Sequence, residues 1–598
     1  MSRNQKALIT ISIIVIAMMS PLLFSQHALL GVDGYFQYNR IYEAAMQIKH
    51  HNLSFINLYS FQQAGRVVNS LYSPLITYIA GALLLILGTW YKFQIVTVFV
   101  VYLVAGYGMY LAARKFQFSQ RRALALAVIF LTSNVVYGYI FGVTWRSLAL
   151  ALLPLFVGPI LTLYQGNWTI KAMLKLGLLV GVLTQFQILT VVLTVPFFVP
   201  FAIHGLSQTK YKQSALLNLL VAILVALLLS LNTILPMLEV FSENTLIAPV
   251  AMQLMDETSL ILQPIYTGVD SSSDIVLTII IYTMLMGLIM FWSRLGNFTR
   301  LFACVAVVYA ILGTSLFPWD ALQQAWPALQ SFIQMPRRIT LVGVPFLILA
   351  TMLVYDDVAQ ATQNFKLSQG ITYTSIFLAL FSFILCTQKV AQNVHYTTME
   401  TTTLADGLQT VDGNVYSKLT HITELQPAFH TRDLSKLIKQ FARTTPDYVP
   451  VPHKFETNGD VYHAYRTNFS ARHAHFKHQV VDNGIQLTWT AKHAKKRAVP
   501  VVKYRRTTLT LNGKTLTDKQ VKQQWSGNLV VKQHKGRNVL TVRYRPSFVT
   551  RLGTHQAVFA WMIAGLSLLF MAFNLQDNAA VQSWWQQLVT KWRAQLIK

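Results

Sequence analysis

The chain has 598 residues, of which 54% are hydrophobic and only 12% are charged, and its formal net charge is +27. This composition excludes an ordinary soluble globular protein and is typical of an integral membrane protein. The two cysteines, Cys304 and Cys386, both lie in predicted membrane helices, and they form neither a disulfide framework nor a metal-binding pattern.

The first apolar run, from Ala7 to Leu30, is long enough to cross a bilayer and lacks the small-residue exit of a cleaved signal peptide. We therefore expect a retained anchor. Arg3 and Lys6 precede it, which places the N-terminus in the cytoplasm by the positive-inside rule. An outer loop, 31–72, follows, in which Tyr35 to Ile48 could form an interfacial amphipathic helix.

Asp33 lies where the first predicted span leaves the membrane, in a region with few charges. A carboxylate at such a position is either a functional group or the solvated end of a helix, and position alone does not decide between them.

The remaining apolar runs predict a polytopic α-helical domain over residues 1–390, and the whole chain is expected to have about 12–13 transmembrane helices. Two topologies are open for the region 73–203. Either 73–90 is re-entrant and 173–203 forms two short helices, or each is a single span. The later spans are expected at 214–237, 274–292, 299–316, 339–355 and 371–389.

Residues 391–555 predict an extracytoplasmic, strand-rich domain, a sandwich, because long apolar runs give way to short alternating stretches. Asn512-Gly513 between two such stretches predicts a hairpin turn. A last span at 556–573 returns the chain to the cytoplasm, so that 574–598 forms an amphipathic tail on the inner surface. The predicted strands are 484–490, 500–504, 507–511, 528–532 and 538–544.

The strand-rich domain is basic, with Lys495, Lys496 and Arg497 in one run. This is either a solvated strand face or a surface for anionic lipid or cell-wall polymer. An extracytoplasmic position argues against nucleic acid as a partner. His473 and His475 would share one face of a strand, but without a supporting acid or cysteine they are better read as surface histidines than as metal ligands.

Polar residues inside the predicted membrane domain are costly unless they are satisfied, so they mark either helix contacts or a wet cavity. Gln185 could hydrogen-bond a neighbouring helix or line such a cavity, and Arg146 closes a short loop between spans. Arg337 and Arg338, at the outer entrance of a late span, could hold a phosphate through fork-like hydrogen bonds.

Taken together, Asp33 with Arg40 after the first span, Tyr72-Ser-Pro74 before the next run and Gln334 to Arg338 before a late span carry a resemblance. The first 390 residues resemble the bacterial GT-C class of multi-span glycosyltransferases and the related membrane family catalogued as 6-pyruvoyl-tetrahydropterin-synthase-related. That class uses a polyprenyl-phosphate sugar donor.

The resemblance implies that Asp33 is a general base or a metal ligand, that Arg40 orients it, and that Arg337 and Arg338 hold the donor phosphate. Tyr72, Arg146 and Gln185 are then substrate-binding positions. The chain differs from the related family in having Gln37, Arg146 and Gln185 where that family has titratable partners. A divalent metal held by one carboxylate would be bound weakly.

Two hypotheses follow. The first is a plasma-membrane glycosyltransferase that moves a sugar from a lipid-linked donor to a cell-envelope polymer or lipid. The second is a non-catalytic protein of the same fold that binds lipid-linked or anionic polymer, or a partner protein, through its basic outer domain.

Overall fold

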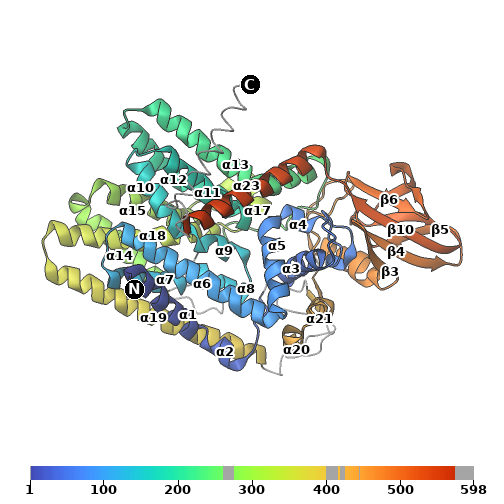
Figure 1. Cartoon of the computed structure of the whole chain (residues 1–598), viewed down its shortest axis with the longest axis horizontal. Coiled ribbons are helices and arrows are strands. Elements are labelled where there is room, and N and C mark those ends of the chain that lie inside the picture. Colours follow the sequence, from blue (N-terminus) through green and yellow to red (C-terminus); the bar gives the residue numbers. More distant parts are fainter. Residues whose placement is uncertain are drawn as a thin grey trace, which may run out of the picture.

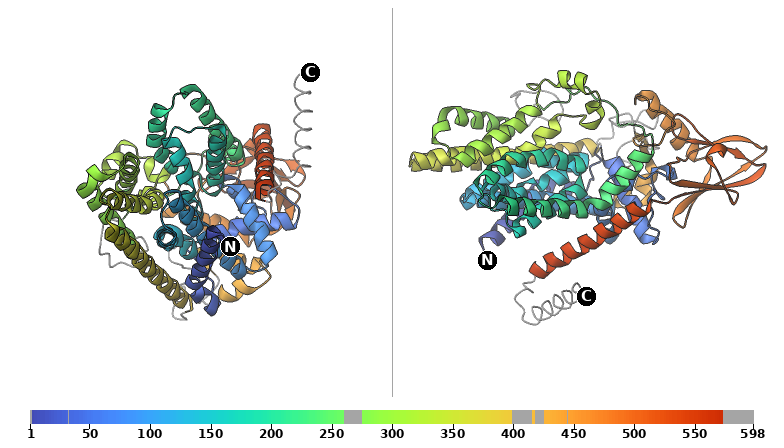
Figure 2. Two further views of the ribbon diagram at one scale, coloured as in Figure 1. Left: turned by 60° about the vertical axis from the view of Figure 1, so that its left-hand side comes forward. Right: turned by 90° about the horizontal axis from the view of Figure 1, so that it is seen from above.

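The computed structural model describes residues 2–31, 33–259, 275–398, 415–417, 425–443 and 445–572. A long helical body occupies one end of the molecule and a strand-rich domain the other (Figure 1). The same division is seen from above, where α23 (Phe548–Ala572) runs back from the strands along the helical body (Figure 2). The expected class, a helical membrane-type protein with a strand-rich domain near the C-terminus, is confirmed at this level.

The helices of the first half are α1 (Arg3–Met18), α2 (Ser20–Ser25), α3 (Gly34–Lys49), α4 (Val68–Leu71), α5 (Pro74–Leu87), α6 (Trp90–Lys115), α7 (Gln120–Leu131), α8 (Asn134–Gly142), α9 (Trp145–Ala151), α10 (Val157–Tyr164), α11 (Ile170–Phe186), α12 (Ile188–Gln208) and α13 (Lys212–Glu243). Those of the second half are α14 (Ile275–Phe291), α15 (Asn297–Leu312), α16 (Trp319–Ala325), α17 (Leu329–Phe332), α18 (Arg337–Ala361), α19 (Phe365–Thr398), α20 (Gln426–His430), α21 (Ser435–Gln440), α22 (Gly459–Tyr465) and α23.

Within the described residues, seven helices are long and apolar enough to cross a membrane, and the bent pair α7–α8 would make an eighth. Several predicted spans correspond to shorter helices, such as the 14 residues of α5 and the 16 of α15. At about 1.5 Å per residue, a helix like α5 is shorter than a hydrocarbon core of about 30 Å. The predicted first span is also interrupted, because the chain leaves α2 through Gln26 in a left-handed conformation (φ 57°).

Of the two topologies left open for 173–203, the structure has the one with two helices. The break is at Gln187, whose φ of −162° and ψ of 118° are those of an extended residue. Near the start of α7, the guanidinium of Arg122 pairs with the carboxylate of Asp356. This ion pair brings the basic loop 114–122 and the acidic end of α18 to the same end of the helical body.

Helix α3 is not the interfacial helix that its pattern predicts. Thirteen of its 16 residues are buried, on all faces, including Arg40 and Glu43. It lies against α5 so closely that a Cβ on Gly81 would come within 2.7 Å of the Ala45 amide nitrogen. Apart from the exposed Lys49, the charged and amide residues of α3 are therefore internal, and each needs a partner inside the protein.

Most predicted strands are present. The strands are β1 (Val415–Ser417), β2 (Phe441–Arg443), β3 (Lys477–Val481), β4 (Gly484–Ala491), β5 (Lys495–Val499), β6 (Thr507–Leu511), β7 (Lys514–Thr515), β8 (Val521–Gln523), β9 (Leu529–Gln533) and β10 (Gly536–Tyr544). One sheet has the order β3-β4-β10-β6-β7 and another the order β5-β9-β8. The predicted turn at Asn512-Gly513 joins β6 to β7 with both residues at positive φ, as a type I′ hairpin requires. The stretch 500–504, predicted as a strand, instead packs its side chains into the core without strand pairing.

The strand-rich domain shares its core with the outer loop. Ile56, Leu58 and Ala64 of that loop are fully buried in one apolar cluster with strand residues such as Leu540. Arg66 fixes the same contact, because its guanidinium donates to the carbonyl oxygens of Thr445 and Asp447. The outer loop is thus an internal layer between α3 and the strands.

Candidate functional site

Asp33 is held at the start of α3 by its own backbone. Its amide nitrogen donates to the carbonyl oxygen of Gly142, 3.0 Å away at the end of α8. Gly31 allows this contact, because a Cβ at that position would lie 2.3 Å from the Phe141 carbonyl oxygen. The Asp33 side chain does not cap α3, and it accepts no hydrogen bond from a described residue. Its carboxylate is partly buried and chemically available.

Arg146 lies near Asp33 from the first turn of α9, directly after the turn that joins α8 to α9. That turn is made by Val143 in a left-handed conformation (φ 52°), after which α9 begins at Trp145. The Arg146 guanidinium has no hydrogen bond or ion pair to any described residue. It lies close enough to Asp33 and Arg337 for both charges to act on it, the acid stabilising its cationic form and the arginine opposing it.

Arg337 and Arg338 begin α18 directly after Pro336. Arg337 forms an ion pair with Glu257, with 2.6 Å between Nη1 and Oε2. Arg338 donates through Nη1 to the carbonyl oxygen of Ile333 at 2.8 Å. The charges of Arg146, Arg337, Asp33 and Glu257 all act on Arg338.

One ion pair and a set of charges that act on one another define one group, which we call the Asp33 site: Asp33, Arg146, Glu257, Arg337 and Arg338. Its members come from four separate stretches of the chain. Three guanidinium groups face two carboxylates, so one positive charge is in excess. A surplus of arginine next to an available carboxylate is suited to an anionic ligand such as a phosphate.

Arg40 does not orient Asp33. Its guanidinium donates to Gln37 Oε1 at 2.8 Å, to Thr77 Oγ1 at 2.7 Å and to the carbonyl oxygen of Tyr72, and it lies 4.5 Å from the centre of the Trp145 ring. Burial lowers its pKa to about 9, so it remains cationic at neutral pH. Arg40 thus joins α3, α5 and α9.

Of the two roles left open for Gln185, the structure shows the hydrogen bond to a neighbouring helix. Its amide exchanges hydrogen bonds with Asn232 on α13, at 2.9 and 3.0 Å, and also donates to the carbonyl oxygen of Leu229 at 2.9 Å. These contacts saturate the side chain and join α11 to α13. Gln185 is a helix-packing residue, so it lies outside the Asp33 site.

Tyr72 connects the site to the strand-rich domain through a residue that sequence reasoning missed, Tyr448. The two rings are 5.8 Å apart and meet edge to face. Burial raises the pKa of Tyr448 to about 12, an effect that the nearby Asp447 increases and the Arg338 charge reduces. Tyr448 therefore lies beside the Asp33 site, although nothing in its local sequence distinguishes it.

Glu43 is the second residue that sequence reasoning missed. Its buried carboxylate accepts hydrogen bonds from the amides of Leu58, Tyr59 and Ser60 at 2.6–2.8 Å, and from the side chains of Ser60 and Gln47. The sequence does contain one signal for Glu43, because Asp33 and Glu43 are the only acidic residues before Glu239. Glu43 organises the outer loop and does not touch the site.

No group of three or more His, Cys, Asp or Glu side chains suited to a metal ion is present in the described part of the chain. His473 and His475 do not share a strand face, because β3 begins only at Lys477. His473 instead stacks on His478, with 3.8 Å between ring centres.

Comparison with protein-family models and with curated proteins gave no match to this chain.

Proposed function

We propose that the protein is a membrane glycosyltransferase that takes a sugar from a polyprenyl-phosphate donor. The observation that carries the proposal is that the Asp33 carboxylate and Arg146, which has no hydrogen bond or ion pair to a described residue, lie near Arg337 and Arg338. The resemblance to GT-C enzymes, with about 12–13 membrane helices, belongs to the same proposal. So do a plasma-membrane location, cytoplasmic termini and an extracytoplasmic Asp33 site.

In the proposed reaction, Asp33 takes the proton from an acceptor hydroxyl as its oxygen forms a bond to the anomeric carbon of the sugar. The bond between that carbon and the phosphate oxygen breaks, and its electron pair leaves with the phosphate. Arg146, whose guanidinium has no partner among the described residues, stabilises the growing negative charge on the leaving group. Arg338 adds to the positive field, while Arg337 is shared with Glu257.

Donor turnover tests this proposal. The purified full-length protein is incubated with radiolabelled polyprenyl-phosphate hexoses and a cell-envelope fraction as acceptor, and release of polyprenyl phosphate is followed by chromatography. Turnover that depends on Asp33 and Arg146 is expected. If none of the donors is consumed by the wild-type protein, the glycosyltransferase proposal is wrong.

A second candidate, a non-catalytic receptor for anionic polymer, is favoured by one feature of the strand-rich domain. Lys496 on the edge strand β5 lies directly opposite Lys532 on β9, and both are exposed. Like charges in register destabilise a sheet, so this pair costs stability that a polyanion would restore. The test is retention on immobilised polyphosphate: replacing Lys495, Lys496 and Arg497 by Glu should abolish it, whereas Asp33→Asn should not.

A further inference from the structure

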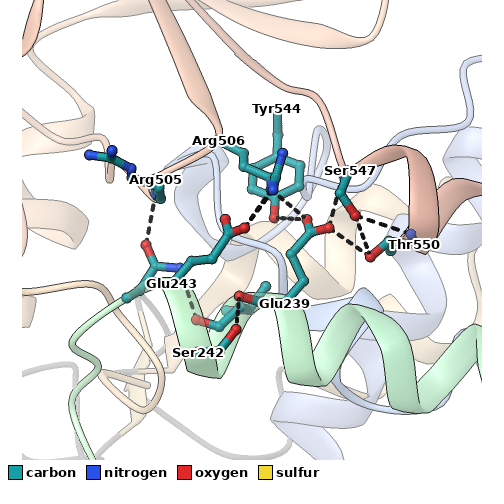
Figure 3. A network of polar contacts seen from close by, with 10 residues as sticks. Glu239, Ser242, Glu243, Arg505, Arg506, Tyr544, Ser547 and Thr550 are labelled. Carbon is teal, nitrogen blue, oxygen red and sulfur yellow. Dashed lines mark hydrogen bonds and ion pairs between the residues drawn. The ribbon is translucent and has the colours of Figure 1, made fainter.

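The end of α13 is joined to the strand-rich domain and to α23 by a polar network centred on Glu239 (Figure 3). The Tyr544 hydroxyl donates to Glu239 Oε1 at 2.7 Å. The Ser547 amide and the Thr550 hydroxyl donate to Oε2 at 2.9 and 2.6 Å. Glu239 is therefore saturated, and it fixes where β10 ends and α23 begins.

Arg506 extends this network to Glu243, the last residue of α13. Its Nε and Nη2 donate to the same carboxylate oxygen at 3.0 and 2.5 Å (Figure 3). Arg506 thus holds the strands on the helix end. It still contributes positive charge to the adjoining surface, because about a third of its side chain is exposed.

The side chains of two neighbouring arginines, Arg505 and Arg545, take no part in this network. Arg505 is fixed by its backbone, whose amide donates to Asn244 Oδ1 at 2.8 Å, while its exposed guanidinium is 4.0 Å from Asp518. That acid is already paired with Lys503 at 2.8 Å. Arg545 is exposed, and its side chain makes no hydrogen bond or ion pair to a described residue.

A hollow of about 430 Å³ lies among these groups, lined by Glu243, Arg505, Arg506 and Arg545. We call it the junction site. Three guanidinium groups and one carboxylate give it an excess of two positive charges. Because Arg505 and Arg545 have unused donors, they can bind an added anion without breaking the network that holds the domain.

The surroundings of the junction site indicate where such an anion comes from. Glu243 is the last residue of a helix apolar enough to span a membrane. Exposed apolar side chains occur on both helices that meet here, namely Leu238 and Phe241 on α13 and Phe548, Val549 and Leu552 on α23, with the polar Ser242 and Arg551 exposed among them. Arginines above exposed apolar helix surfaces match a lipid, whose charged headgroup lies at the level of the helix end and whose tails lie along the helices.

We propose that the junction site binds the negatively charged phosphate headgroup of a membrane lipid, with Arg505 and Arg545 as its principal donors. Arginine recognises phosphate through paired, charge-assisted hydrogen bonds, which lysine does not reproduce as well. The site is separate from Asp33 and does not depend on any catalytic role of that residue.

The test is lipid binding to the delipidated, full-length protein in neutral detergent, followed by native mass spectrometry. The probes are dioctanoyl phosphatidic acid, dioctanoyl phosphatidylcholine and inorganic phosphate. Phosphatidic acid should bind at least about tenfold more tightly than phosphatidylcholine. Replacing Arg505 and Arg545 together by Gln should remove that preference, and replacing both by Lys should restore it in part.

The matched control is Lys514→Gln with Arg537→Gln, which removes the same charge from exposed positions at the β6–β7 turn and the start of β10. It should bind phosphatidic acid as the wild type does. If millimolar inorganic phosphate displaces phosphatidic acid, the arginines recognise the phosphate group alone. If phosphate does not displace it, the acyl chains also contribute to the binding affinity. The proposal is overturned if the Arg505/Arg545 variant keeps the preference for phosphatidic acid while its thermal unfolding is unchanged.

Discussion

The amide nitrogen of Asp33 donates a hydrogen bond to the carbonyl oxygen of Gly142, 3.0 Å away. This bond ties the start of α3 to the end of α8. Arg146, about one helical turn further along the chain, lies near the Asp33 carboxylate. The relative position of acid and arginine is therefore set by backbone geometry. Their side chains remain available for a ligand, which is the property that the proposed function requires.

Gly31→Ala tests this backbone contact. The added Cβ would lie 2.3 Å from the Phe141 carbonyl oxygen, so the Asp33 segment must move away from α8. We expect a loss of stability of about 1–3 kcal/mol from overpacking, together with a marked loss of donor turnover. Thermal unfolding in detergent and the donor assay measure the two effects.

Gly158→Ala is the control, because a Cβ at that helical position meets no atom within 4 Å. It should leave turnover unchanged and raise stability slightly, as alanine favours a helix more than glycine does. Equal behaviour of the two variants would show that the close approach of Gly31 does not position Asp33.

Glu43→Gln tests the organisation of the outer loop. The amide cannot accept from all the donors that converge on the carboxylate, and its own N–H groups would face the amides of Tyr59 and Ser60. Leaving buried donors without an acceptor costs about 1–3 kcal/mol each, so we expect a clear fall in the unfolding temperature. Glu456→Gln, at an exposed position, should have no such effect. Wild-type stability of Glu43→Gln would contradict the assigned role.

The stacked pair His473 and His478 predicts a pH dependence of stability. Burial, helped by the nearby His473, lowers the pKa of His478 from 6.5 to about 4. Between these values the unfolded chain binds more protons than the folded one, so stability is lost as pH falls from about 6.5 towards 4. Thermal unfolding of the wild type across this range should show the loss.

His478→Phe keeps an aromatic ring but removes the titrating group, so its unfolding temperature should depend less on pH over the same range. The exposed His475 provides the control, and His475→Gln should follow the wild type. If His478→Phe and the wild type lose stability in parallel, other groups carry the pH dependence.

Local sequence predicted those features that are set locally. The Asn512-Gly513 hairpin follows from two adjacent residues that tolerate positive φ, and the two-helix form of 173–203 was one of two stated topologies. The position of Asp33, and the arginines gathered around it, were also anticipated as candidates. Their mutual approach could only be inferred from the resemblance.

What could not be predicted depends on partners far along the chain. The pattern of α3 is amphipathic, yet the helix can be buried because Arg40 finds an acceptor in α5 and Glu43 finds donors in the outer loop. Tyr448 reaches the Asp33 site only because the strand-rich domain packs on that loop. A periodicity within one helix carries no information about such distant contacts.

The most direct test of the account is donor turnover by Asp33→Asn, which keeps the size of the side chain and removes its ability to take a proton. Asp320→Asn, an exposed acid at the start of α16, is the matched control. We predict that Asp33→Asn lowers kcat at least about a hundredfold, within the range of general-base catalysis, and that Asp320→Asn does not. Wild-type turnover by folded Asp33→Asn would contradict the account.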